Sequence, residues 1–376
     1  MKKFKSFMLA YICIMPYFLM FSVSNAEKGY LKGSQAIGDE FQVNTYVEDN
    51  QDGVDVAIAD NGNFVITWQC VGQDGDGYGV FAQMYGNDGN PIGSEFQVNS
   101  YEDNNQGAPS VAMDEDGNFI IVWHSNYHKV IGQHETIYAQ RYDQKGDIVG
   151  GEFRVNSSSL GDHFYPYVAM NSKGDFVLSW RYLDSENSKK YIYAKKYNSD
   201  GSVKVNDFMV SETESTYIKD PHIGIDINDS GTFVITWFDS DGSDEFPNIY
   251  AKLYDKDGNL VKDIGHANTR KVNSHYPSVS LCEEGEFFIT WGMHNQIDIN
   301  GVFVRKFDKL GNPLSEEIQV NTFATLDTNA SQNVPDIGID KDGNFVIAWM
   351  SYGQDGSGWG IYAQLFKMII SLVHQK

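Results

Sequence analysis

Hydrophobic residues gather in short runs that end in tryptophan and recur every 54 to 58 residues along the chain. These tryptophans stand at positions 68, 123, 180, 237, 291 and 349, and the runs they close read, for example, NFVITW and NFIIVW. Apolar side chains fill both alternating positions of a run, as Phe64 and Ile66 do beside Val65. A strand that is apolar on both faces lies between two packed layers. The repeat therefore predicts six similar sheets, each packed between its neighbours.

Three further short segments accompany each tryptophan run. One precedes it, such as PSVAMD, and two follow it, such as VFAQMY and EFQVN. The connections NDG, DEDG and KDG supply the Asp, Asn and Gly residues that tight hairpin turns require. Six units of four short antiparallel strands predict an all-β, six-bladed β-propeller. An open solenoid and a pair of β-sandwiches are the alternatives.

The two ends of the repeat region are complementary. EFQVN at 40–44 is a fourth-strand segment with no earlier strands, and the chain after Phe366 lacks a fourth-strand segment. We expect the N-terminal strand to pair with the last blade and close the ring. The expected organisation is a signal peptide at 1–26, a linker at 27–37, one propeller domain at 38–366 and a tail at 367–376.

The N-terminal segment has the composition of an export signal. Three lysines precede a long apolar run, and Ser24-Asn25-Ala26 provides a cleavage site after Ala26. An uncleaved membrane anchor is the alternative. Cleavage changes the formal net charge from −23 to −26, which argues against nucleic acid or an anionic membrane as partner. We expect a monomeric secreted, periplasmic or cell-surface protein with no transmembrane segment after cleavage.

Two cysteines remain after cleavage of the signal. Cys70 lies in unit one and Cys282 in unit five, two blades apart around a closed ring. We expect two unpaired thiols buried in sheets, because a disulfide needs closely spaced Cα atoms.

Glycine–aspartate loops repeat in units one and six, as GQDGDGYG at 72–79 and GQDGSGWG at 353–360. They lie on the rim that gathers the long loops, where functional residues of a propeller are expected. Their oxygen ligands suit calcium, and Asp74, Asp76 and Asp355 are the candidate metal ligands, with Gln73 and Gln354 as candidate ligand-binding residues. The alternative is a tight loop whose acidic side chains face water.

The first strand of each unit carries a polar residue two places before a small one. The small residues are Ala57, Ala112, Ala169, Gly224, Ser280 and Gly338. The polar positions include Asp55, Tyr167, His222 and Asp336, which should line the central channel. Because units one and six become neighbours on closure, we hypothesise a cation or polar-ligand site around Asp55, Asp336, Asp74 and Asp355.

Aromatic residues and histidines populate the same rim. The aromatic set that can stack on sugar rings is Tyr78, Tyr127, Phe164, Tyr165, Phe246 and Trp359. The histidines at 124, 128, 134, 163, 222, 275 and 294 are expected to be solvated loop residues, because their spacing fits no metal site.

These features favour a non-enzymatic binding protein for a glycan, an extracellular protein or a cell-surface polymer, with calcium as the one candidate cofactor. No catalytic residue is assigned, because no nucleophile elbow, phosphate loop or triad is recognisable. A metal-dependent hydrolase of lactonase or phosphodiesterase type at the channel mouth is one alternative. A purely structural surface protein is the other.

Phe64 to Asn99 resembles a repeat of exported bacterial proteins with the consensus FVVTWxSxGQDGSGxGVFAQRYDxxGxPxGxEFQVN. The resemblance extends over residues 38–366 and weakens in units three to five. It implies exported, non-catalytic repeat modules and brings no catalytic residues with it.

Overall fold

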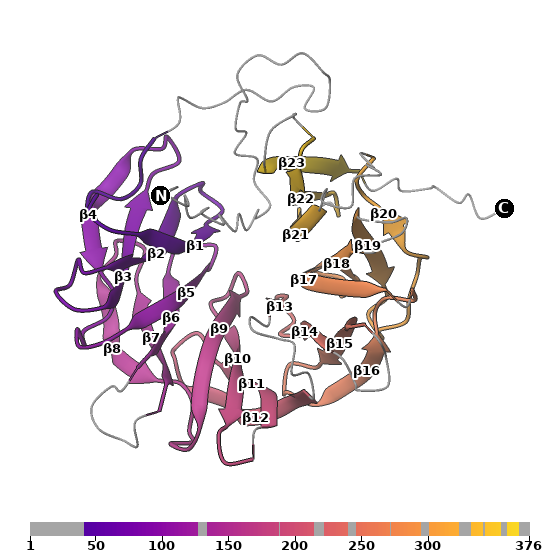
Figure 1. Cartoon of the computed structure of the whole chain (residues 1–376), viewed down its shortest axis with the longest axis horizontal. Coiled ribbons are helices and arrows are strands. Elements are labelled where there is room, and N and C mark those ends of the chain that lie inside the picture. The colour runs from indigo at the N-terminus through magenta and orange to yellow at the C-terminus, as the bar shows by residue number, and fades with distance from the viewer. Residues whose placement is uncertain are drawn as a thin grey trace, which may run out of the picture.

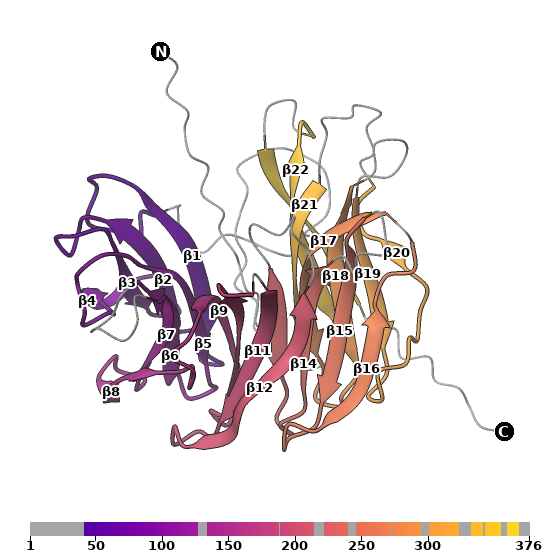
Figure 2. The ribbon, with the colours of Figure 1, turned by 60° about the horizontal axis from the view of Figure 1, so that its bottom comes forward.

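The structure is a computed structural model of the chain. It describes residues 41–126, 134–187, 189–213, 222–239, 246–270, 272–294, 301–322, 332–340, 343–354 and 359–367. Its β-sheets stand around a common axis and follow one another in chain order (Figures 1 and 2). The described residues contain no helix long and apolar enough to cross a membrane.

Each sheet is an antiparallel meander that runs outward from the axis. The inner strands are β1 (Gln51–Ile58), β5 (Gln106–Met113), β9 (Asp162–Met170), β13 (Ile223–Ile227), β17 (Asn273–Leu281) and β21 (Gln332–Ile339). The tryptophan strands are β2 (Phe64–Val71), β6 (Phe119–Ser125), β10 (Phe176–Asp184), β14 (Phe233–Asp239), β18 (Phe287–His294) and β22 (Phe345–Tyr352). The third strands are β3 (Tyr78–Tyr85), β7 (Thr136–Tyr142), β11 (Lys189–Tyr197), β15 (Asn248–Tyr254), β19 (Gly301–Phe307) and β23 (Trp359–Phe366). The outer strands are β4 (Pro91–Gln97), β8 (Ile148–Arg154), β12 (Val203–Thr213), β16 (Leu260–His266) and β20 (Ile318–Gln319).

The predicted six-bladed propeller is confirmed, and we number the blades 1 to 6 in chain order. The tryptophan strands of blades 2 to 5 are buried on both faces, as the prediction required, and Trp180 and Trp291 are fully buried. In β2 and β22 part of the side chains is exposed. Blades 1 to 5 have four strands, whereas the described part of blade 6 has three, β21, β22 and β23.

Valine in the EFQVN segment fills the space between two blades. Val98 packs in one cluster with Trp123 of blade 2, and Val155 packs likewise with Trp180 of blade 3. Each segment therefore leaves its own blade and buries an apolar side chain against the tryptophan of the next. Val43 of the N-terminal segment packs against Trp68 of blade 1 in the same way.

Asparagine in the same segment completes the hydrogen bonding of the third strand. The Asn99 Oδ1 atom accepts the Val80 backbone N–H at 2.7 Å, and Asn156 does the same for Ile137 at 2.9 Å. The Nδ2 groups donate to a carbonyl two residues later, as Asn99 does to Tyr101 at 2.8 Å. These bonds satisfy polar backbone groups that would otherwise be buried without a partner.

The glutamate of EFQVN ties its blade to the preceding connection. Glu95 accepts the Thr45 backbone N–H at 2.6 Å, and Glu152 accepts that of Ser100 at 2.8 Å. The three side chains of the motif thus have three separate tasks, which explains why the motif recurs in this form.

The N-terminal segment shows half of this pattern in the described residues. Asn44 donates to the Tyr46 carbonyl at 2.7 Å, and Thr45 is held by Glu95. In blade 6, Ile361 of β23 is 65% exposed, while its counterpart Ile249 in blade 4 is fully buried. Closure of the ring by residues 40–44 stays a prediction, and Ile361 is the position at which it can be tested.

The aspartate–glycine turns are hairpin turns, as predicted. The Asp114 carboxylate accepts the backbone N–H and the side-chain amide of Asn118, and Asp308 does the same for Asn312. Gly117 has a φ of 91°, which a side chain at that position would disfavour. The carboxylates therefore serve the turn itself.

The two cysteines are free and buried, as expected. Cys70 lies on β2 and Cys282 follows β17, so they belong to blades 1 and 5.

Candidate functional site

The predicted channel carboxylates lie on inner strands and bond to the neighbouring blade. Asp55 on β1 accepts the backbone N–H of Val111 on β5 at 2.9 Å. Asp336 on β21 accepts the Ser278 hydroxyl of β17 at 2.7 Å. Adjacent inner strands share no backbone ladder, so these side chains provide hydrogen bonds between the blades.

The inner strands of the other neighbouring blades pack against each other, as β1 does with β5 and β17 with β21, whereas the closeness of units one and six stays a prediction. Burial, followed by the negative charge of Asp55, acts to raise the pKa of Asp336 to about 6, although the Ser278 hydroxyl and the Ile337 N–H oppose the rise. Burial likewise raises the pKa of Asp55 to about 6. The negative charge of Asp55 thus adds to the rise in the pKa of Asp336, which burial dominates.

The register predicted for blade 4 was wrong. Gly224 was assigned to the small position, but it pairs with Thr236, as Asp55 pairs with Thr67. Asp226 pairs with Val234 and so occupies the place of Ala57. His222 consequently lies before β13 and not at the channel position assigned to it. The proline of the first strand and the phenylalanine of the tryptophan strand are ten residues apart in units two, three, five and six but twelve apart in unit four. This difference of two residues could have revealed the shifted register from the sequence.

Asp226 is a third inner-strand carboxylate that sequence reasoning missed. It accepts the backbone N–H of Leu281 on β17 at 2.7 Å and thereby links blades 4 and 5. Burial raises its pKa to about 7, against the lowering effect of the Leu281 and Ile227 N–H groups. Its partners are within the chain, so its first role is to join the blades.

The glycine–aspartate loop of blade 1 packs toward blade 2. Asp76 accepts the Asn104 backbone N–H at 3.0 Å, and Asp74 accepts from Asn99 at 3.4 Å. Gln73 donates to Glu95 of the same blade. These bonds direct Asp74 and Asp76 to the connection between blades 1 and 2, whereas Gln73 is held within blade 1.

The matching loop of blade 6 is described in part. Asp355 lies outside the described residues, while the Gln354 Oε1 atom is buried without a hydrogen-bond partner. Trp359 meets Tyr352 edge to face at 5.3 Å, and Tyr78 at the start of β3 is partly buried. Among the residues the structure describes, no group of three or more His, Cys, Asp or Glu side chains could hold a metal ion. Calcium binding stays a prediction.

A β-bulge interrupts the inner strand at the same place in five blades. In four of them a non-glycine residue directly before proline has a positive φ between 48° and 54°; these residues are Ala108, Tyr165, Tyr276 and Val334. Such residues are rare and carry strain, and bulges re-aim side chains near functional sites. Tyr165 and Tyr276 are partly exposed aromatic rings presented in this way. Tyr167, two residues after Tyr165, packs instead against the core between blades 3 and 4.

Two histidines expected in solvated loops are instead held between blades 2 and 3, which corrects that prediction. His124 on β6 lies edge to face with the rings of Phe164 and Tyr165, with distances of 6.3 and 5.9 Å between ring centroids. His163 on β9 is 4% exposed, and its Nδ1 atom accepts the Trp180 indole N–H at 3.0 Å. That bond requires the neutral ring to carry its proton on Nε2. Of the other predicted histidines, His128 lies outside the described residues.

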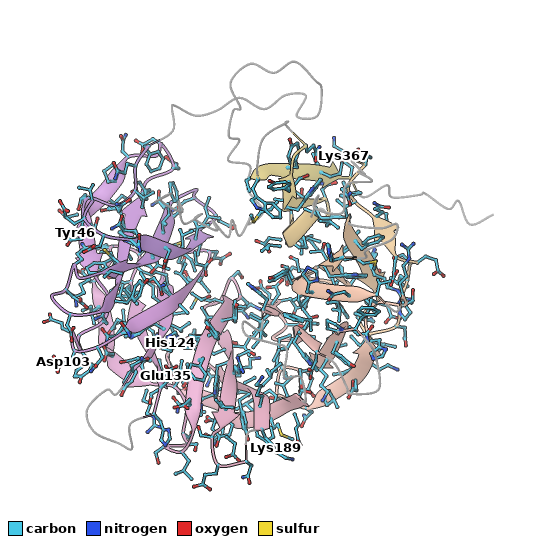
Figure 3. The ribbon with its side chains drawn as sticks, in the orientation of Figure 1. Tyr46, Asp103, His124, Glu135, Lys189 and Lys367 are labelled. Atoms are coloured by element: carbon cyan, nitrogen blue, oxygen red, sulfur yellow. The ribbon has the colours of Figure 1, made fainter. Side chains whose placement is uncertain are left out.

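A carboxylate pair completes this location. The Asp162 carboxylate accepts the Glu135 backbone N–H at 3.3 Å and contacts His134 Nδ1 at 3.1 Å. The Glu135 carbonyl accepts the His163 backbone N–H at 3.0 Å. Glu135 and His124 lie close together on blade 2 (Figure 3). We call His124, Glu135, Asp162, His163, Tyr165 and Tyr182 the blade 2–3 rim site.

Burial dominates the electrostatics of the blade 2–3 rim site. It raises the pKa of Glu135 to about 7, with the negative charge of Asp162 adding to the rise. It lowers the pKa of His124 and that of His163 to about 4, so both rings are neutral at neutral pH.

Three polar atoms of the blade 2–3 rim site are buried without hydrogen-bond partners. They are His124 Nδ1, Glu135 Oε2 and His163 Nε2. The Leu160 carbonyl acts to raise the pKa of the His163 ring, but it lies outside hydrogen-bond geometry to the Nε2 atom. Because nearly all buried polar groups in proteins are paired, these three atoms from two blades are open to a further polar partner, water included. Sequence patterns carry no signal for this feature, since it depends on the packing of two blades.

No family model and no curated protein matches the sequence. Solved structures do resemble it. A Penicillium chrysogenum alpha-L-arabinanase complexed with arabinobiose aligns with a TM-score of 0.50 at 14% identity, covering 83% of this chain and 92% of that chain. A protein of unknown function from Dyadobacter fermentans DSM 18053 has a TM-score of 0.49 at 11% identity, covering 84% and 94%. A polysaccharide lyase named ulvan lyase has a TM-score of 0.49 at 10% identity, covering 81% of each chain.

At these identities the likeness concerns the fold alone. The chain is a six-bladed β-propeller. The resemblance to exported bacterial repeats stays a prediction.

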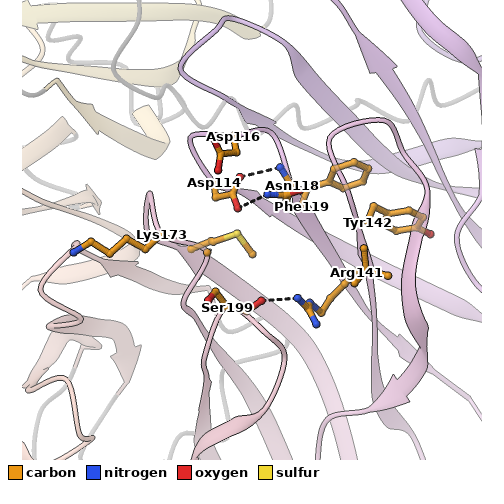
Figure 4. Close-up of a pocket in the computed structure, with 11 residues that line it drawn as sticks. Asp114, Asp116, Asn118, Phe119, Arg141, Tyr142, Lys173 and Ser199 are labelled. Carbon is orange, nitrogen blue, oxygen red and sulfur yellow. Dashed lines mark hydrogen bonds between the residues drawn. The ribbon is translucent and has the colours of Figure 1, made fainter.

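A cavity of about 280 Å³ lies on the opposite rim of the propeller, among the short turns of blades 2 and 3 (Figure 4). Its two basic side chains are already engaged: Arg141 donates to the Asp200 carbonyl at 2.7 Å, and Lys173 donates to the Asp229 carbonyl at 2.7 Å. Asp114 is committed to its own turn. The cavity therefore lies away from the unpaired groups of the blade 2–3 rim site.

Proposed function

We propose that this protein is an exported, non-enzymatic propeller that binds a glycan at the blade 2–3 rim site. The single observation that supports this most is the set of three buried polar atoms without partners, His124 Nδ1, Glu135 Oε2 and His163 Nε2. Sugar hydroxyls both donate and accept hydrogen bonds, so adjacent hydroxyls of one ring can satisfy such a mixed set. The side chains of His124 and Glu135 keep some exposed surface, which gives a ligand a route to them.

Aromatic rings beside these atoms support the same proposal. Tyr165 and Phe164 lie against His124, and Tyr182 lies against His163 at 4.8 Å between ring centroids. All three residues are partly exposed. Binding sites for small polar molecules combine aromatic walls with a few placed polar groups. Polysaccharide-acting enzymes among the solved structures of similar fold belong to the same ligand class, although the likeness extends only to the fold.

Replacing Tyr165 by asparagine should weaken glycan binding at least about tenfold, because the stacking surface is lost. Asparagine accepts a positive φ, so the bulge conformation of 49° at this position is preserved. The matched control is Tyr276→Asn, which makes the same change at the same bulge of blade 5, where φ is 54°. A glycan array followed by calorimetry on the strongest ligand measures both variants. Equal losses in the two variants, or an array without ligands, would contradict the proposal.

The export signal, the extracellular location and the assistance by calcium belong to the proposal as well. Calorimetric titration with calcium in the presence and absence of the glycan tests the last of these, since calcium that assists binding must change the measured affinity.

A further inference from the structure

We propose that the blade 2–3 rim site selects a sugar that carries a protonated amino group, that is, an amino sugar of the glucosamine class. This inference rests on the proposed glycan binding and specifies its ligand. The first argument is charge. Glu135 and Asp162 lie close enough for one carboxylate to influence the other. In the part of the chain that the structure describes, no lysine or arginine forms an ion pair with either of them.

Two histidines of the site are neutral rings. His163 is more than nine-tenths buried and is fixed as a neutral ring by Trp180. His124 is held neutral by burial. His134 is the one further titratable group in contact with Asp162, from the residues just before β7. Asp162 thus has His134 as a partner, whereas Glu135 Oε2 has none among the described residues, and a cation supplied by a ligand is the counter-charge for Glu135.

The unpaired atoms fit the donor and acceptor pattern of an amino sugar. Glu135 Oε2 is an acceptor, so it requires a donor such as an ammonium group. His163 Nε2–H is a donor, so it requires an acceptor such as a sugar hydroxyl oxygen. An ammonium group and a hydroxyl oxygen are a donor and an acceptor of these two kinds, and an amino sugar carries both. The neighbouring Tyr165 and Tyr182 rings favour a cation further, because aromatic faces attract positive charge.

Three hexasaccharides that differ only at carbon 2 of each ring provide the test. They are the β-1,4-linked hexamers of glucosamine, of N-acetylglucosamine and of glucose, measured by calorimetry in 0.15 M salt at pH 7.5. We expect the glucosamine hexamer to bind at least about tenfold more tightly than the other two. Hexalysine is the control for attraction between a polycation and this acidic protein, and it should bind more weakly than the glucosamine hexamer.

The variant Glu135→Gln removes the charge and keeps the shape of the side chain. It should abolish the preference for glucosamine, so that the three hexamers bind with affinities within about twofold of one another. Glu102→Gln makes the same change at an exposed position between blades 1 and 2 and should leave every affinity unchanged.

The outcomes separate this inference from the proposed function. Equal affinity for the three hexamers overturns the amino-sugar inference and leaves glycan binding standing. A preference that survives Glu135→Gln, or that hexalysine reproduces, overturns the assignment to this site. Absence of binding by all three, together with an empty glycan array, overturns both proposals and leaves water as the occupant of the site.

Discussion

Ile361→Ala should lower the free energy of unfolding by about 2–5 kcal/mol, the loss typical of a buried isoleucine, although Ile361 of β23 is 65% exposed in the described structure. The reason is the predicted closure of the ring. Residues 40–44 carry the same EFQVN segment that covers the equivalent position in other blades. Ile249→Ala in blade 4, where the side chain is fully buried, is the reference for the full effect. Urea unfolding of both variants gives the two values.

A truncation distinguishes closure from any other cover. In a protein lacking residues 27–42, Ile361→Ala should cost less than about 0.5 kcal/mol, as an exposed substitution does. The register offers a second measurement in the full-length chain. Phe81 pairs with Gln97 in blade 1, so the repeat predicts that Gln42 faces Tyr362. The pair Gln42→Cys and Tyr362→Cys should form a disulfide on oxidation. Absence of this bond, with a small effect of Ile361→Ala in the intact protein, would show that the N-terminal segment does not complete blade 6.

The difference in unfolding free energy between the Asp226→Ala variant and the natural protein should shift in favour of the variant as the pH rises. Burial raises the pKa of Asp226 to about 7 in the folded state, while the unfolded value is near 3.8. The folded protein therefore binds the proton more tightly, and its stability falls relative to the variant as the pH increases from about 4 to 7. Between pH 5 and pH 8 the difference in unfolding free energy should shift by about 3 kcal/mol in favour of the variant. Alanine fits at this position, since Ala57, Ala112 and Ala169 occupy it in blades 1 to 3.

Urea unfolding at pH 5 and pH 8 measures this shift. Asp60→Ala, at an exposed position in a turn of blade 1, serves as the control and should show the same pH dependence as the natural protein. Parallel pH profiles for Asp226→Ala and the natural protein would mean that the carboxylate is as well solvated in the folded chain as in the unfolded one.

Much of the fold could be predicted because each blade repeats the same physical solution. A strand that is apolar on both faces must be covered on both sides, and the spacing of Trp68, Trp123 and Trp180 sets the period of the blades. Where one unit departs from the pattern, the prediction fails locally. The two extra residues between Pro221 and Phe233 shift the register of blade 4, and Asp226 then takes a place that was assigned to Gly224.

The candidate site was less accessible to sequence reasoning. His124 and His163 are ordinary polar residues near strand ends, and nothing in their spacing tells that each lies against the neighbouring blade. Their burial depends on how blades 2 and 3 pack together, and burial is also the main cause of the raised pKa of Glu135. Two of the aromatic residues selected from the sequence, Phe164 and Tyr165, do lie at this location, against His124.

The EFQVN segment has a consequence for how the propeller can be divided. Val98 belongs by sequence to unit one, but it completes the core around Trp123, and Val155 stands in the same relation to Trp180. A fragment cut at the boundary of a sequence repeat would expose the valine of its own EFQVN segment. Its tryptophan would also lose contact with the valine of the preceding unit. Single repeats are therefore poor candidates for independent folding. A circular permutant opened within a blade, by contrast, keeps each of these valines in contact with the tryptophan of the next blade. The repeat that is read from the sequence and the unit that buries a core are displaced from each other by one connecting segment.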